Sequence, residues 1–287
     1  MGSIKETMKV SVETLIKHPK LFVPFGIFNG LMVIWMYLYM QEFGKIFANP
    51  PFFPPFRLFI LWGIFYLFLI IIFPFMESWE YSLLVSFFIN KSSSIVENAT
   101  LGLKKYVGFL GLLIVHYVLS MLSMIPLFPF FILIAVSIFL FDKHGLLIAF
   151  IFFIIFMLIM ILLFLLIQIL MGFIKPVYTY TGHFFDSLKK GYYIAHEHLN
   201  KALIIYLITL IAGILLSIPV IILYSFFIKN IITQKTMQYE SSVLSFPVWF
   251  FVYAVIIGTV IQTFLPTAFT HLYLTFKRES LAPTPEQ

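Results

Sequence analysis

The chain has 287 residues, of which 62% are hydrophobic and only 10% are charged, and it carries a formal net charge of +6 with no cysteine. A soluble domain is about one quarter charged, so this composition excludes an ordinary soluble globular protein, which could not cover so much apolar surface. The lack of cysteine excludes disulfides, thiol catalysis and iron–sulfur clusters.

Six apolar runs are long enough to cross a bilayer, which requires about 20 residues at a rise of about 1.5 Å each. They are 21–40, 57–76, 107–127, 146–174, 202–228 and 247–269. We expect no cleavable signal peptide, because the first 20 residues hold no apolar core ahead of a small-residue cleavage site. The apolar stretch 128–141 stays open as a short seventh span, a re-entrant piece or an extension of the third span.

The distribution of basic residues predicts the orientation. With six spans and an inner N-terminus, most lysines and arginines fall on the inner side, whereas a seventh span would nearly balance the two sides. We therefore expect six spans with both termini cytoplasmic. The basic residues lie at the ends of apolar runs, which favours lipid head groups over nucleic acid as their partners.

Two long stretches indicate an internal repeat. Residues 94–126 and 187–219 have equal length, and each runs from a serine to an Ile-Pro pair, amphipathic first and apolar afterwards. A shorter relative begins at Ser11. We predict a single membrane domain of three units, approximately 8–93, 94–186 and 187–280, followed by a disordered tail at 281–287.

Each predicted unit ends in a span with a proline near its cytoplasmic end, namely Pro74, Pro176 or Pro266. Proline removes a backbone donor and clashes with the preceding turn, so it kinks a helix, and membrane helices tolerate such kinks. The expected fold class is an all-α polytopic membrane protein with six transmembrane helices in three hairpins. A cytoplasmic-side amphipathic interfacial helix is expected before each hairpin, because apolar residues recur there with helical spacing.

The end of the last span carries a short pattern made of Pro266, Thr270, Leu272, Tyr273, Lys277 and Arg278. With the repeated hairpins, this pattern resembles the six-span membrane domain of some glycerophosphoryl diester phosphodiesterases and of related prokaryotic families. The resemblance implies the fold and a place in the cytoplasmic (inner) membrane of a prokaryote. It implies no activity, because the phosphodiesterase chemistry of such proteins lies in a separate soluble domain.

Polar residues within membrane spans are costly and are therefore candidates for function. Four lie inside the predicted spans, namely Asn29, His116, Gln168 and Gln262. Hydrogen bonding between helices is the simpler role for each of them.

A second group of polar residues lies at the inner ends of the kinked spans. These residues are Glu77, Glu80, His183, Asp186 and His271. If the kinked spans converge, their side chains would surround a cytoplasmic vestibule that could bind a metal or relay protons. The alternative is a set of ordinary interfacial residues beside an aromatic belt, and the sequence identifies no metal site, cofactor or catalytic residue.

We expect a non-enzymatic membrane protein that binds lipid, a hydrophobic small molecule, or another membrane or peripheral protein. The first alternative is a small-molecule transporter, which should contain a polar cavity reaching mid-membrane. The second is an intramembrane hydrolase or metal enzyme, which should bring Glu77 and Glu80 close to His183 or Asp186. A lipid binder should instead have apolar grooves between its hairpins.

Overall fold

The computed structural model describes residues 4–48, 56–90, 94–124, 128–140, 142–234 and 248–281. Within these ranges every regular element is a helix, which confirms the all-helical fold class. In chain order the elements are α1 (Ile4–Lys17), η1 (Pro19–Phe22), α2 (Val23–Ala48), α3 (Phe56–Leu67), η2 (Phe68–Ile72), α4 (Phe73–Asn90), α5 (Ile95–Met124), α6 (Phe128–Leu140), α7 (Asp142–Thr181), α8 (Phe184–Glu197), α9 (Leu199–Gln234) and α10 (Val248–Leu281). Of the expected tail at 281–287, all but the first residue lies outside the described residues.

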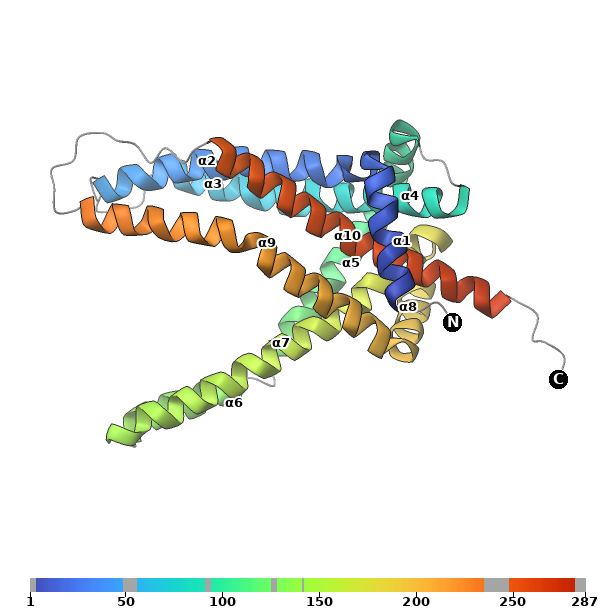
Figure 1. Cartoon of the computed structure of the whole chain (residues 1–287). Coiled ribbons are helices and arrows are strands. Elements are labelled where there is room, and N and C mark those ends of the chain that lie inside the picture. Colours follow the sequence, from blue (N-terminus) through green and yellow to red (C-terminus); the bar gives the residue numbers. More distant parts are fainter. Residues whose placement is uncertain are drawn as a thin grey trace.

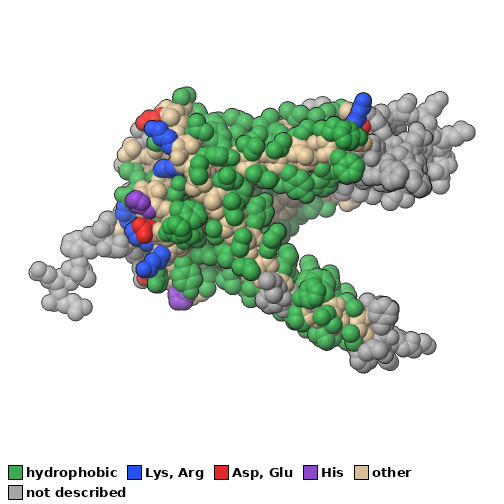
Figure 2. Space-filling model, turned by 180° about the vertical axis from the view of Figure 1, so that it is seen from behind, with side chains coloured by type: hydrophobic (Ala, Val, Ile, Leu, Met, Phe, Trp, Pro, Cys, Tyr) green, Lys and Arg blue, Asp and Glu red, His purple; other side chains and the backbone are tan. Residues whose placement is uncertain are grey.

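Six helical stretches are long and apolar enough to cross a membrane, as the sequence predicts. They are Pro19–Tyr39, Phe56–Asn90, Ile95–Val136, Leu147–Thr181, Leu199–Pro219 and Phe250–Lys277. The long helices run back and forth between two ends of the molecule, and α1 begins and α10 ends at the same end, beside α8 (Figure 1). Most of the charged side chains on the face drawn in Figure 2 gather at this end, which we call the inner end.

The core lies toward the inner end, where the long helices converge. Phe109, Phe173 and Phe269, from α5, α7 and α10, are among the largest fully buried side chains. The rings of Phe173 and Phe269 meet edge to face, with centroids 5.1 Å apart. Away from this core the helices separate, and the arm of α6 and α7 diverges from the body that contains α2, α3 and α9 (Figure 1).

The stretch 128–141 is counted with the third span and not as a seventh. Its helix α6 runs along the first part of α7, where the rings of Phe131 and Phe156 lie 4.7 Å apart. The candidate span Ile95–Val136 includes most of α6. This arrangement agrees with an extension of the third span, which is one of the three alternatives that the sequence leaves open, and the placement of the stretch in the membrane stays a prediction.

Two of the three expected interfacial helices are separate elements, α1 and α8, and the third is not. Pro19 follows α1 and His198 leaves helical geometry after α8, so each of these helices is interrupted before the next span. No such break separates 94–106 from the following span, and this segment therefore forms the first turns of α5.

Small side chains on α1, on α8 and at the start of α5 face the protein. Ser187, Gly191 and Ala195 are buried on α8, whereas Phe185 is 81% exposed. A Cβ atom at Gly191 would lie 2.8 Å from the Cα atom of Ile174, so α8 approaches α7 closely. In the same way α1 packs against α10, and the start of α5 packs against α4.

The three prolines lie in different local settings. The π-helical turn η2 immediately precedes α4, in which Pro74 is the second residue. Proline has no N–H group, so the backbone carbonyl four residues before Pro74 lacks its usual helical donor. In a π-helical turn this carbonyl can accept from the N–H one residue further along the chain. Pro176 and Pro266 lie within the continuous helices α7 and α10, and the kinks predicted there stay predictions.

Candidate intramembrane binding site

A cavity of about 480 Å³ lies between the candidate spans and is lined by residues of α2, α4, α7, α9 and α10. Its lining is mainly apolar, and it includes Phe25, Phe73, Leu210 and Ile214. The polar residues of the lining are Glu77, Tyr81, Gln168, Lys175, Tyr206, Thr209, Ser217 and Gln262. A cavity of this size, with an apolar wall and a few polar groups, has the usual composition of a small-molecule site.

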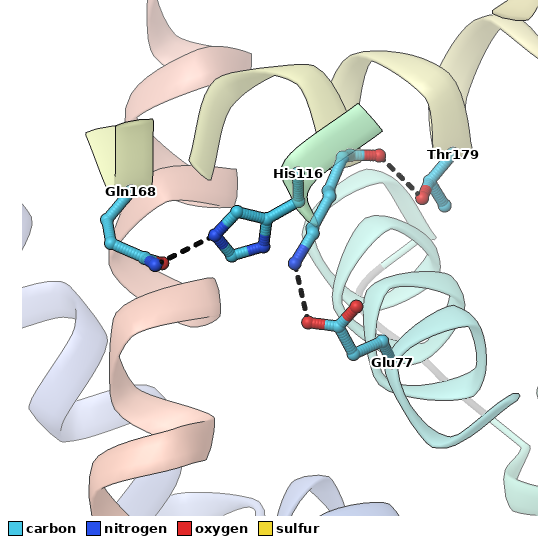
Figure 3. Close-up of polar contacts among 5 residues, drawn as sticks. Glu77, His116, Gln168 and Thr179 are labelled. Atoms are coloured by element: carbon cyan, nitrogen blue, oxygen red, sulfur yellow. Dashed lines mark hydrogen bonds and ion pairs between the residues drawn. The ribbon is translucent and has the colours of Figure 1, made fainter. Parts of the chain in front are cut away.

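An ion pair between Glu77 and Lys175 lines the cavity. Glu77 follows Pro74 on α4, and Lys175 precedes Pro176 on α7, so the two proline-containing helices position the pair. Lys175 Nζ donates to Glu77 Oε1 at 2.6 Å, and both residues are buried, with 8% and 7% exposure. Figure 3 shows the Glu77 carboxylate with the dashed line that marks this ion pair.

The ion pair keeps unused hydrogen-bonding capacity. Glu77 Oε2 is buried and has no hydrogen-bond partner within the described part of the chain. The lysine ammonium has three donors, and the bond to Glu77 accounts for one of them. Thr179 Oγ1 donates to the carbonyl of Lys175 at 2.9 Å, which holds the end of α7 together below the pair.

The four polar residues expected inside the spans form hydrogen bonds between helices. His116 of α5 lies 2.9 Å from Gln168 Nε2 of α7 (Figure 3). Asn29 of α2 donates to Gln262 Oε1 at 3.0 Å and to Thr259 Oγ1 at 3.2 Å, both on α10. Gln168 and Gln262 also line the cavity, so their hydrogen bonds fix the position of its wall.

The five predicted vestibule residues lie in different surroundings. Glu77 is paired with Lys175 in the cavity lining, and Glu80 is completely buried with no hydrogen-bond partner among the described residues. His183 and Asp186 are exposed at the start of α8. His271 is half-buried on α10, with its ring 5.4 Å from that of Phe88.

This distribution gives no support to a shared metal site. Among the residues that the structure describes, no group of three His, Asp or Glu side chains is placed to hold a metal ion. The partner of Glu77 is a lysine, and the two candidate ligands on α8 face outward.

Lys175 is the site residue that the sequence reasoning missed. The positive-inside count treats it as one more lysine at the inner end of a span, although it is the only Lys, Arg, Asp or Glu between residues 144 and 185. A lone charge beside a proline in so long an apolar run is a signal for an intramembrane partner. The partner itself, almost one hundred positions earlier, has no local signature.

No protein-family model matches the chain, and no curated protein or solved structure gives a significant match. The resemblance to the membrane domain of glycerophosphoryl diester phosphodiesterases therefore stays a prediction.

Proposed function

We propose that the protein is a non-enzymatic integral membrane protein that binds a lipid or another hydrophobic small molecule between its helices. The observation that carries the proposal is the cavity of about 480 Å³, which falls within the range of roughly 300–1,000 Å³ common for ligand sites. Its wall is mainly apolar and its polar groups are few. An amphipathic molecule fits both properties.

The position of α9 supports access to this cavity from the bilayer. Leu210, Ile214 and Ile221 line the cavity, yet 40%, 54% and 56% of their surfaces are exposed. These side chains thus belong both to the cavity lining and to the exposed surface of α9. Figure 2 shows the molecule hollowed between the α6–α7 arm and the remaining body, and acyl chains would reach the cavity from this side.

A small-molecule transporter is the second candidate, because Gln168, Thr209 and Gln262 bring polar groups into a cavity between the spans. Movement of a solute across proteoliposomes would favour this function. An intramembrane hydrolase has weaker support, since Glu77 pairs with Lys175 and the exposed His183 lies on another surface.

Two serines on α9 give a matched test of cavity binding. Ser217 lines the cavity, Ser225 is exposed, and each hydroxyl donates to the carbonyl four residues earlier at 2.8 Å. Ser217→Trp would fill the cavity, whereas Ser225→Trp would add the same ring on the outside. The full-length protein, purified in mild detergent, would be examined by native mass spectrometry.

We expect the wild type and Ser225→Trp to retain a bound lipid or other apolar adduct, and Ser217→Trp to lose it. An adduct that is retained equally by all three proteins would contradict cavity binding, as would a wild type without any adduct. Circular dichroism would verify that both tryptophan variants keep their helical content.

We further infer that three units of one design build the bundle in the inner membrane of a prokaryote, with both termini cytoplasmic. The contacts of the amphipathic segments support the repeat: the start of α5 packs on α4 and α8 packs on α7, while α1 packs on α10. Each segment thus lies against the second span of the preceding unit, and α1 closes the ring. The gathering of charges at the end where α1 begins and α10 ends supports the orientation.

A further inference from the structure

We propose that the cavity selects amphiphiles whose head group carries no net charge, and that the Glu77–Lys175 pair makes this selection. The inference rests on the proposed function, because it specifies the class of lipid that occupies the cavity. A zwitterionic phospholipid is the main representative of this class, and an anionic phospholipid is the competitor that the cavity rejects.

The charges of the cavity lining balance. Among the described lining residues, Glu77 is the one acid and Lys175 is the one base, and every other polar residue is a neutral amide, hydroxyl or phenol. The two charged groups are in direct contact at 2.6 Å. The described part of the lining therefore offers a dipole, and it has no excess charge for a ligand to neutralise.

A head group with a single charge would leave an unbalanced charge beside this pair. An anion could reach the donors of Lys175 that the bond to Glu77 does not use, but it would place a second negative charge near the buried carboxylate, with no further positive charge in the described lining to balance it. If the anion displaced Glu77 instead, it would break a buried ion pair, which is strongly unfavourable because the remaining charge has lost its contact with water and has gained nothing in exchange. A free cation that binds Glu77 would create the same problem for the lysine.

A zwitterionic head group avoids this cost. Its ammonium can lie against the carboxylate, where Glu77 Oε2 lacks a partner within the described residues. Its phosphate can lie against the donors of Lys175 that the bond to Glu77 does not use. The pair stays intact, and both of its charges gain a second partner of opposite sign.

The dimensions of the cavity agree with an amphiphile that lies along α9. Tyr206 and Ile221 both line the cavity, and 15 residues of helix separate them by about 22 Å. Glu77 and Lys175 lie in the second halves of the candidate spans Phe56–Asn90 and Leu147–Thr181, which run toward the inner end. The head group would therefore lie at the inner end and its chain would follow α9 outward.

The test is a competition between two lipids with identical acyl chains. The full chain would be reconstituted in nanodiscs that contain equal amounts of phosphatidylethanolamine and phosphatidylglycerol, released into mild detergent, and analysed by native mass spectrometry. The variant Ser217→Trp supplies the background of lipid bound outside the cavity. After its subtraction, we expect the wild type to favour phosphatidylethanolamine about tenfold.

Charge variants of the pair test the cause of this preference. Glu77→Gln leaves a lone lysine and should shift the preference to phosphatidylglycerol. The exchange Glu77→Lys with Lys175→Glu keeps the cavity neutral and should keep the wild-type preference. Glu13→Gln removes an exposed carboxylate on α1 and should leave the ratio unchanged.

The outcomes separate the two proposals. A wild type that retains both lipids equally above the background would overturn the selection but not the binding. A preference that is unaffected by Glu77→Gln would also overturn it. If no lipid is retained above the Ser217→Trp background, the proposed function itself fails. The wild-type ratio decides the question even if a charge variant does not fold.

Discussion

The buried ion pair makes a strong prediction about stability. Replacing Lys175 by methionine leaves Glu77 at 7% exposure with no described partner for either oxygen. Removing one member of a buried pair costs about 3–5 kcal/mol, and Glu77→Gln should be costly for the same reason. The double variant Glu77→Gln with Lys175→Met has no buried charge, so it should be far more stable than either single variant.

The assay is equilibrium unfolding of the full chain in mixed micelles with increasing fractions of denaturing detergent. The two single variants and the double variant form a thermodynamic cycle, whose coupling free energy should be about 3 kcal/mol. The exposed pair of Lys9 and Glu13, at 3.8 Å with side chains 71% and 47% exposed, provides the control. Its coupling should be only about 0.3–0.5 kcal/mol.

Two results would refute this reasoning. Single variants that each cost less than about 1 kcal/mol would show that water reaches the pair freely, because exposed pairs have energies of that size. A double variant whose cost equals the sum of the two single costs would show that the residues do not interact.

Three further predictions concern the bundle. Gly102→Ala should destabilise the protein by about 1–3 kcal/mol, because the added Cβ would lie 2.8 Å from the backbone of α4. Gly30→Ala should be tolerated, because its added Cβ would have no atom within 4 Å. Unfolding in mixed micelles would compare the stabilities of the two variants. Asn29→Ala removes two hydrogen bonds between helices and should cost about 1 kcal/mol in the same assay. Because the chain has no cysteine, the single variants Lys9→Cys and Lys189→Cys each carry one thiol that can be labelled. Both thiols should be protected from an impermeant thiol reagent in intact cells. Labelling of one variant but not of the other would refute the common orientation.

Composition and periodicity were sufficient to predict the spans. A bilayer requires about 20 apolar residues per helix, and this constraint acts locally along the chain. The structure accordingly has six candidate spans. The end of α1 also agrees with a local signal, since Pro19 follows it directly, whereas the end of α8 at His198 has no such signal in the sequence.

The cavity could not be predicted in the same way. The contact between Glu77 and Lys175 joins two helices almost one hundred residues apart, and their pairing depends on how these helices pack. Glu77 is a candidate site residue from the sequence alone, whereas Lys175 enters only the count of basic residues that predicts the orientation of the chain in the membrane. His183 and Asp186 show the opposite case, because they are candidates from their helical spacing, but their exposure at the start of α8 separates them from the buried carboxylates.

The claim that an amphiphile occupies the cavity can be tested most directly with a photoreactive lipid. A phosphatidylethanolamine with a diazirine in one acyl chain would be incorporated into nanodiscs with the full chain, activated by light, and located by peptide mass spectrometry. We predict labelling of the α9 segment that contains Leu210, Ile214 and Ile221, and loss of this label in Ser217→Trp but not in Ser225→Trp. Labelling spread evenly over all outward-facing helices and unchanged by Ser217→Trp would contradict the account.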